Sequence, residues 1–148
     1  MKNIPGVRLW LLLMKAYQSL MAETGRLAAA NGLGDSEFRV LEVLLHKGAL
    51  PVNVIGPKVF LTPGSISVAV DRLVDKHLVT RRECPTDRRI RFVELTPAGR
   101  DLIARVFHEH EQQMEGFASA LSPREREQLA AALKKFGQAP GQTFGVDQ

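Results

Sequence analysis

Two Thr-Pro pairs, Thr62-Pro63 and Thr96-Pro97, enclose the part of the sequence that most restricts the fold. A threonine followed by proline is typical of a helix start, because the threonine caps the first amides and proline suits the first helical position. Between the two starts, a helical apolar stripe is followed by two short stretches, 78–82 and 90–95. The second stretch alternates apolar and polar residues with the two-residue period of a strand. We therefore predict a helix, a β-hairpin and a further helix in direct succession.

The remainder of the chain has the three- and four-residue spacing of amphipathic helices. A Gly56-Pro57 pair is expected to shorten or bend one of them, because proline in a helix interior lacks a backbone donor. Ser122 and Glu125 have the spacing of a capping box at the start of the last helix. The helices outside the segment described above are predicted at 7–30, 38–47, 52–60, 97–121 and 123–136. The expected fold class is mainly α with a small β-hairpin, an α+β arrangement.

Length and composition favour one compact domain. The chain has 148 residues, of which 45% are hydrophobic, enough for a single core. Cys84 is the only cysteine, which excludes an internal disulfide and paired cysteine ligands for zinc. The apolar run at 9–14 is far shorter than the roughly 20 residues that a membrane helix needs. These observations fit a reducing, cytoplasmic setting, with no membrane partner.

The positive charge of the chain is concentrated around the predicted hairpin. Between Lys76 and Arg91 there are six Lys and Arg against two acidic residues, which equals the net charge of +4 of the whole sequence. An isolated cluster of this kind would most simply be a solvated hairpin tip. Its position directly after a pair of short helices is instead typical of a winged helix-turn-helix, whose second helix enters the DNA major groove. A hairpin loop that carries arginines can then reach a neighbouring minor groove.

The segment 71–103, "DRLVDKHLVTRRECPTDRRIRFVELTPAGRDLI", resembles the MarR-type (multiple antibiotic resistance regulator) family of transcription factors. It has the family's order of recognition-helix end, strand, Asp-x-Arg wing, strand, and Leu-Thr-x-x-Gly before a long helix. "EFRVL" at 37–41 and "LTPGSISVAVDRL" at 61–73 agree with it. The resemblance implies a homodimer on a pseudo-palindromic double-stranded DNA operator. It also implies dimerisation helices at 1–31 and 97–136 and a winged DNA-binding region at 33–95. The stretch 137–148, rich in Gly, Gln and Pro, is expected to be a flexible tail.

The helix that begins at Pro63 is the expected recognition helix. Ser65, Val68 and Arg72 lie opposite its apolar stripe, so they face DNA if the stripe faces the core. Hydroxyls and amides at the helix start suit phosphate or base edges, although a hydroxyl there can also simply cap the helix. The expected DNA-contacting residues of this helix are Thr62, Pro63, Gly64, Ser65, Ser67, Val68 and Arg72.

The wing supplies the second part of the expected DNA surface. The resemblance places Arg89 in the minor groove, with Asp87 orienting it through a charge-assisted hydrogen bond. Arg88 is expected to meet a phosphate. Two residues depart from the family pattern. Val68 stands where a polar base reader is common, and Phe60 stands where the turn usually has glycine.

Many members of the family are repressors that a small aromatic or phenolic molecule releases from DNA. The resemblance then places Trp10, Met14, Tyr17 and Phe38 near an effector pocket, while helical spacing of such residues more often indicates core packing. Cys84 offers a redox alternative, because Arg81, Arg82 and Arg88 could lower its pKa, or it is simply a small residue.

Other functions have little support in the sequence. His108 and His110 lie about 200° apart on a helix and cannot share one ion, while His108 with Glu111 would need ligands from elsewhere. We therefore expect neither a metal nor a cofactor. No Gly-rich phosphate loop or nucleophile elbow is present, which argues against an enzyme. The rival function is a winged domain for protein contacts, with little preference among DNA sequences.

Overall fold

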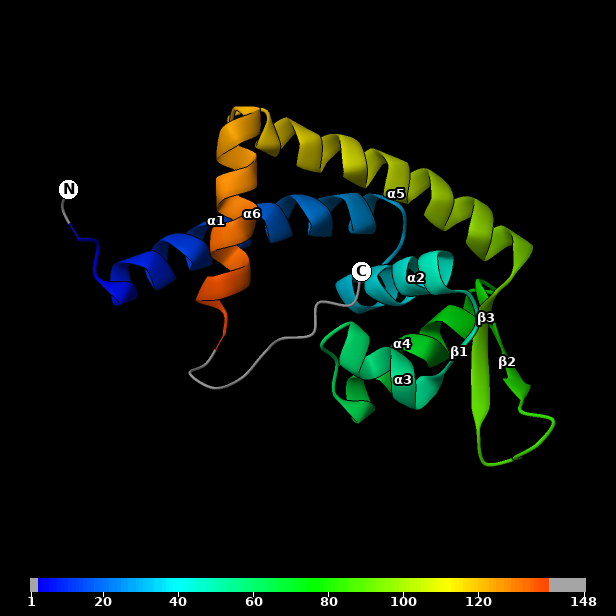
Figure 1. The fold of residues 1–148 in the computed structure, drawn as a ribbon. Helices are drawn as coiled ribbons and strands as arrows, with labels where there is room; N and C mark the ends of the chain where they lie inside the picture. The colour runs from blue at the N-terminus through cyan, green and yellow to red at the C-terminus, as the bar shows by residue number, and fades with distance from the viewer. Residues whose placement is uncertain (1–2, 139–148) are drawn as a thin grey trace. The chain divides into compact units, whose positions relative to one another are not determined.

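The structure is a computed structural model that describes residues 3–138. These residues form two compact units, one up to Gln112 and one from Gln113 onward. The predicted tail lies outside the described residues except for Gly137 and Gln138. Within residues 3–138 there are six helices and three strands, whose order can be followed in Figure 1. Their bounds are α1 Gly6–Ala30, α2 Asp35–Lys47, β1 Leu50–Pro51, α3 Val52–Lys58, α4 Pro63–Asp75, β2 Val79–Glu83, β3 Arg91–Leu95, α5 Pro97–Ala118 and α6 Pro123–Phe136.

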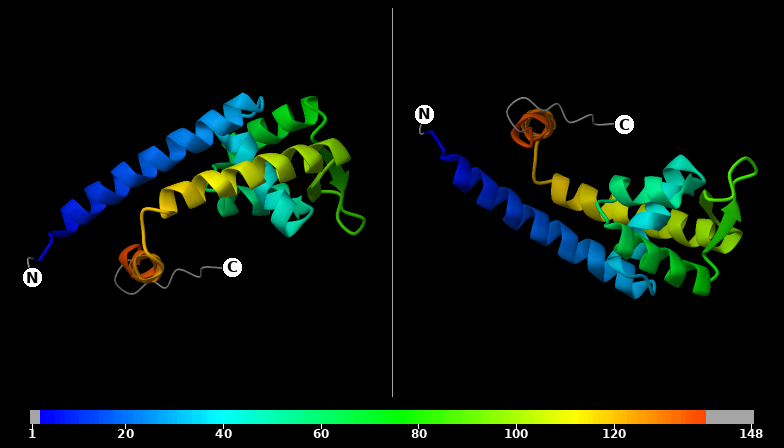
Figure 2. Two further views of the ribbon diagram at one scale, coloured as in Figure 1. Left: turned by 90° about the horizontal axis from the view of Figure 1, so that it is seen from above. Right: turned by 90° about the horizontal axis from the view of Figure 1, so that it is seen from below.

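The first unit has the mainly α fold with a hairpin that the sequence predicts. Helices α2, α3 and α4 pack around one apolar core together with β2, β3, the end of α1 and the first half of α5. The largest side chains that are fully buried there include Phe38, Leu41, Leu44, Ile55, Leu73 and Ile103. The N-terminal half of α1 extends away from these helices (Figures 1 and 2). Its side chains there are largely exposed.

The hairpin is part of a three-stranded antiparallel sheet with the order β1-β3-β2. Val79 pairs with Leu95 and Glu83 with Arg91, so β2 and β3 form the wing. The strand β1 was not predicted, because two residues with a proline carry no alternating pattern. Leu50 is recognisable as a strand residue only through its pairing with Val93.

Several predicted ends differ from the structure by one to three residues. The strands begin at Val79 and Arg91 rather than at 78 and 90, and α5 ends at Ala118 rather than at 121. The helix α3 ends at Lys58 rather than at 60. It is short because Phe60 has a φ of 57°, which ends the helix in the left-handed region.

The second unit contains the end of α5 and all of α6. The predicted capping box is present: the Glu125 amide donates to Ser122 Oγ, and the Ser122 amide donates to a Glu125 carboxylate oxygen at 2.8 Å. Arg126 pairs with Glu115 at 2.7 Å and joins α6 to the end of α5. Helix α6 buries none of its residues.

Candidate nucleic-acid interface

The start of α4 is capped as its sequence predicts. The Ser65 amide donates to Thr62 Oγ1 at 3.2 Å, and the Thr62 hydroxyl donates to Ser65 Oγ at 2.9 Å. Pro63 occupies the first helical position. Both hydroxyls remain exposed, so capping does not remove them from the surface. The first turn of α4 therefore presents hydroxyl groups at a helix start, an arrangement that suits anionic oxygens.

The buried and exposed faces of α4 carry the residues that the sequence predicts for each. Ile66, Ala69, Val70 and Leu73 are buried in the core. Ser65, Ser67, Val68 and Arg72 are exposed, and 49% of Val68 is accessible although its side chain is apolar. The exposed face therefore combines hydroxyls, one valine and one cation, groups that can contact phosphates and base edges.

A groove of about 380 Å³ runs between this face and the start of α2. Arg72 provides its cation, and the nearby Glu37 carboxylate is buried and paired with Lys76. Lys76 also donates to the Gly32 carbonyl at 2.7 Å, which ties the end of α4 to the α1–α2 loop. The groove is lined by Gly34, Asp35, Ser36, Glu37, Gly64, Ser65, Val68, Ala69 and Arg72.

A second groove, of about 620 Å³, lies between α3, α4 and the wing. It brings Ser67 of α4 together with Arg89 and Arg91 of the wing, so the helix and the wing share one surface. Sequence reasoning did not find the contribution of α3. Asn53 and Pro57 line this groove, but their chemistry gives no signal without the neighbouring elements.

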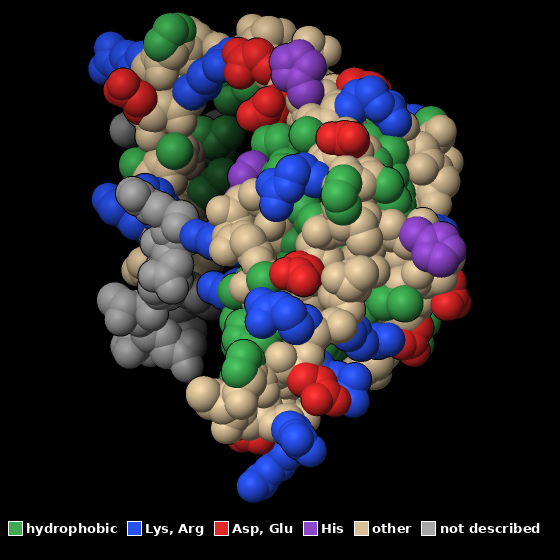
Figure 3. Space-filling model, turned by 90° about the vertical axis from the view of Figure 1, so that its right-hand side faces the viewer, with side chains coloured by type: hydrophobic (Ala, Val, Ile, Leu, Met, Phe, Trp, Pro, Cys, Tyr) green, Lys and Arg blue, Asp and Glu red, His purple; other side chains and the backbone are tan. Residues whose placement is uncertain are grey.

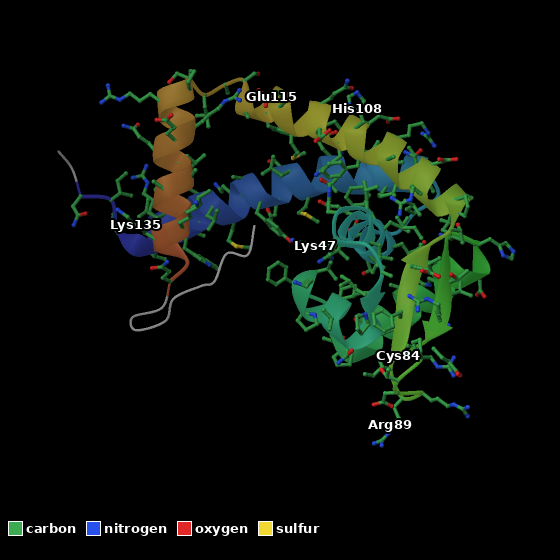
Figure 4. The ribbon with its side chains drawn as sticks, turned by 45° about the vertical axis from the view of Figure 1, so that its right-hand side comes forward. Lys47, Cys84, Arg89, His108, Glu115 and Lys135 are labelled. Carbon is green, nitrogen blue, oxygen red and sulfur yellow. The ribbon has the colours of Figure 1, made fainter. Side chains whose placement is uncertain are left out.

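The wing tip presents Arg89 to solvent. Its side chain is 95% exposed and points away from the protein in Figure 4. Asp87 accepts a hydrogen bond from the Arg89 amide at 3.0 Å, whereas the Arg89 Nε lies 3.8 Å from the same carboxylate. Asp87 therefore shapes the turn through the backbone. The expected charge-assisted hydrogen bond to the guanidinium is not formed in this chain, since 3.8 Å is too long.

Most other cations of the basic cluster are paired locally. Arg81 pairs with Asp71, Arg82 Nε lies 3.7 Å from Glu94, and Arg91 Nη2 lies 3.5 Å from Glu83. Figure 3 shows acidic and basic side chains mixed on this side of the molecule, with basic ones projecting at its lower edge. Within residues 3–138, Arg88 makes no ion pair. Arg88 is therefore the cation of the cluster without an ion pair among the described residues, and it lies at the wing tip beside Arg89, whose pair with Asp87 is long.

Cys84 lies in the wing above Arg89 (Figure 4) and is partly exposed. Its pKa is lowered from the ordinary thiol value, mainly because the Thr86 hydroxyl, 3.2 Å from the sulfur, donates to the thiolate. The amides of Thr86 and Asp87 add to this effect. A lowered pKa was expected from the sequence, but its cause is hydrogen bonding to the sulfur rather than the neighbouring arginines.

The four residues expected near an effector pocket do not share one exposed surface in this chain. Trp10 and Tyr17 are 53% and 51% exposed on α1, whereas Phe38 is 2% exposed in the core. Met14 is half-buried. The Phe38 ring packs edge to face against His110 of α5, with ring centroids 5.4 Å apart. Phe38 therefore packs in the core and does not line an open pocket here.

Helix α5 carries the histidines that the sequence places next to acidic residues. His108 Nδ1 lies 3.8 Å from Glu111, on an exposed face. Over the part of the chain that the structure describes, no three His, Cys, Asp or Glu side chains gather as metal ligands. The helices described there are too short or too polar to cross a membrane.

Comparisons with known proteins agree with this arrangement. A family model described as "MarR family" matches residues 31–90. The HTH-type transcriptional regulator MhqR of Bacillus subtilis is 37% identical over 132 residues, which are 89% of this chain and 91% of the relative. The HTH-type transcriptional repressor MdtR of the same organism is 27% identical, over 87% of this chain and 83% of the relative.

A solved structure has the same fold. BpsR of Bordetella bronchiseptica, whose DNA binding is regulated by 6-hydroxynicotinic acid, superposes with a TM-score of 0.78 at 27% identity. The match covers 88% of this chain and 99% of that chain.

Proposed function

The chain belongs to the MarR family of DNA-binding, winged-helix transcriptional regulators, and on this premise we propose that it is a homodimeric repressor released by a small aromatic ligand. The relatives and the family are transcriptional regulators, not enzymes. The proposal includes action on chromosomal DNA in the cytoplasm of a bacterial-type cell.

One observation carries the proposal: Ser67 on the exposed face of α4 lines a common groove with Arg89 and Arg91 of the wing. An α-helix fits the major groove of B-DNA, and an adjacent wing can follow the backbone to the minor groove. Arg72 and Arg88 are suited to phosphates, and the exposed Arg89 side chain is suited to a narrow minor groove. The proposed DNA-contacting set remains Thr62, Pro63, Gly64, Ser65, Ser67, Val68, Arg72, Asp87, Arg88 and Arg89.

A homodimer is supported by apolar side chains that this chain leaves exposed. Along α1 they include Val7, Trp10 and Leu12, between 53% and 66% exposed. Along α6 they are Leu129, Leu133 and Phe136, between 42% and 46% exposed. Apolar stripes of this length on soluble chains mark contacts with another chain. We propose that 1–31 and 97–136 form the dimer, with the winged regions at 33–95 binding DNA.

Two-fold symmetry determines the form of the operator. A symmetric pair of α4 helices contacts two equivalent half-sites, so the operator is pseudo-palindromic. The half-site centres are expected to lie about one helical turn apart, roughly 34–36 Å.

The effector proposal is supported by an aromatic cluster between α2 and α5. His46 packs edge to face on Phe107 with centroids 4.6 Å apart, and Phe107 and Phe38 both pack against His110. Within this cluster, His110 Nδ1 is buried without a hydrogen-bond partner. An aromatic acid or phenol could stack on such rings and satisfy this nitrogen once the helices separate. BpsR, whose DNA binding responds to a hydroxylated aromatic acid, is the relative that suggests this class.

Release requires that the ligand prefers the arrangement that does not bind DNA. A nearly complete switch requires about 10⁴-fold tighter binding to that arrangement, or about 5.5 kcal/mol. Repression is supported by the relative MdtR, which is named a repressor.

Selection of bound duplexes from a random pool, followed by footprinting, tests the proposed function. The expected result is an enriched inverted repeat, protected on two successive turns by a dimer. Addition of 6-hydroxynicotinate or simple phenolic acids should release the complex and raise the melting temperature of the free protein. Binding without preference among duplexes would instead support a module for protein contacts. Release by peroxide that Cys84→Ser abolishes would support the redox alternative.

A further inference from the structure

The side chain of Phe60 is exposed although its backbone has an unfavourable conformation. Its φ of 57° lies in the left-handed region, where a bulky side chain is strained. Its side chain is nevertheless 90% exposed, the highest value among the large apolar residues that the structure describes. The protein therefore gains no core packing from this ring.

The backbone around Phe60 explains why the unfavourable conformation is kept. The Leu61 amide donates to the Gly56 carbonyl at 2.9 Å, and the Phe60 amide donates to the Pro57 carbonyl at 3.5 Å. This is a Schellman motif, in which the residue at Phe60 must be left-handed and is usually glycine. Arg39 Nη1 of α2 donates to the Val59 carbonyl at 3.0 Å and fixes the same turn. The fold thus demands the conformation but not the aromatic ring.

The charges of the residues near Phe60 indicate what its ring contacts outside the chain. Phe60 comes two residues before Thr62, the cap of α4, and therefore borders the proposed DNA surface. Residues 43–70 contain no aspartate or glutamate, and the exposed Lys58 is close by in the sequence. The turn joins the end of α3 to the start of α4 (Figure 1), and Leu61, the next residue, lines the groove that Arg89 and Arg91 also line. A segment without carboxylates beside the recognition helix suits a DNA strand, because DNA phosphates would repel carboxylates there.

We propose that the Phe60 ring packs against the deoxyribose edge of the operator strand that borders the major groove, so that it anchors the start of α4. The inference rests on the proposed DNA-binding function. A contact with sugar carries no sequence information and neutralises no phosphate. The ring should therefore increase affinity for every duplex equally, without changing the salt dependence of binding.

The chain offers a matched control at His77. Its φ is also 57°, and the same two hydrogen bonds surround it, from Leu78 to Leu73 and from His77 to Val74. His77 is exposed at the opposite end of α4 and has no place on the proposed surface. Glycine at either position relieves the same backbone strain.

The experiment compares Phe60→Gly, Phe60→Asn, Phe60→Tyr and His77→Gly with the wild type. Both glycine variants should melt about 2–5 °C higher, because glycine accepts the left-handed conformation. Phe60→Gly and Phe60→Asn should bind the selected operator and an unrelated duplex about tenfold more weakly. This loss corresponds to roughly 60 Å² of apolar ring surface that is no longer buried against DNA. Phe60→Tyr and His77→Gly should bind like the wild type, and all slopes of log K against log salt should agree.

Three results with the variants would overturn the inference. Operator affinity of Phe60→Gly equal to that of the wild type would show that the ring contacts no DNA, while the proposed function would stand. A changed dimer dissociation constant in sedimentation would assign the ring to a second copy of the chain. A loss confined to particular base pairs would indicate base contact instead. If the wild type itself binds no duplex, the proposed function and this inference fall together.

Discussion

Gly99 lies directly against the backbone of Leu78. A Cβ atom at position 99 would come within 2.8 Å of the Leu78 carbonyl carbon and would overlap its oxygen. The contact joins the first turn of α5 to the segment between α4 and β2. Thr96 reinforces it, because its hydroxyl donates to the His77 carbonyl at 2.8 Å and accepts from the Gly99 amide at 2.9 Å. The Leu-Thr-x-x-Gly pattern thus joins α5 to the end of the proposed recognition helix.

Gly99→Ala is expected to destabilise the protein by about 3 kcal/mol or more, since an added methyl group meets rigid backbone rather than a flexible side chain. Thermal and urea unfolding measure this change. Gly116→Ala is the matched control in the same helix, where an added Cβ meets nothing within 4 Å. It should stabilise the protein by about 0.5–1 kcal/mol, because alanine favours helix. Equal effects of the two substitutions would contradict the proposed packing role of Gly99.

The elements that the sequence predicted correctly have local signals. Thr62-Pro63 and the Ser122–Glu125 capping box each satisfy amides within one turn, so the residues that start a helix also identify it. The strand β1 lacks such a signal, because Leu50 becomes a strand residue only through β3. The early end of α3 at Lys58 follows from the left-handed Phe60, an unusual conformation for an aromatic residue.

The proposed site was predictable to a similar extent. Helical spacing placed Ser65, Val68 and Arg72 on the exposed face, because the buried stripe of α4 determines the opposite one. Spacing could not reveal which arginines are neutralised. Arg81 pairs with Asp71 of α4, a contact that exists only after the hairpin folds back on the helix. Asn53 likewise comes to line the second groove only in the folded chain, where α3 lies beside α4 and the wing.

Arg89→Ala is expected to weaken operator binding about tenfold, or ~1.4 kcal/mol, through loss of the proposed minor-groove contact. The melting temperature should not change, because the side chain is 95% exposed. Fluorescence anisotropy with the selected operator measures the affinity. Arg100→Ala removes the same charge from an exposed position at the start of α5 and should bind almost like the wild type. Comparable losses in both variants would indicate only a general effect of net charge.

Arg72→Ala tests the proposed phosphate contact on α4. Each neutralised phosphate contributes about 0.9 to the slope of log K against log salt, so the slope should become shallower by about one unit. The affinity should fall on operator and unrelated duplexes alike, because a phosphate carries no sequence information. A binding titration across several salt concentrations gives the slope. An unchanged slope together with altered base preference would assign Arg72 to a base instead.

The lowered pKa of Cys84 predicts thiolate formation at lower pH than for an ordinary thiol. Iodoacetamide alkylation at a series of pH values should therefore have its midpoint below that of the urea-unfolded protein. Thr86→Val removes the hydroxyl that donates to the thiolate, so its midpoint should move upward. Because Cys84 is the only cysteine, Cys84→Ser supplies the unreactive baseline. A midpoint unaffected by Thr86→Val would exclude this hydrogen bond as the cause.

Leu133→Glu is expected to dissociate the proposed dimer. Leu129, Leu133 and Phe136 follow one stripe of α6, each more than 40% exposed, and a 14-residue helix that buries none of its residues is marginal in water. A carboxylate in such an interface should raise the dimer dissociation constant about thirtyfold or more, which sedimentation velocity can measure. Operator affinity should fall as well, because two linked winged regions bind more tightly than one. Gln128→Glu adds the same charge off the stripe and should remain dimeric. If Leu133→Glu stays a dimer at micromolar concentration, α6 does not contribute to the contact between chains.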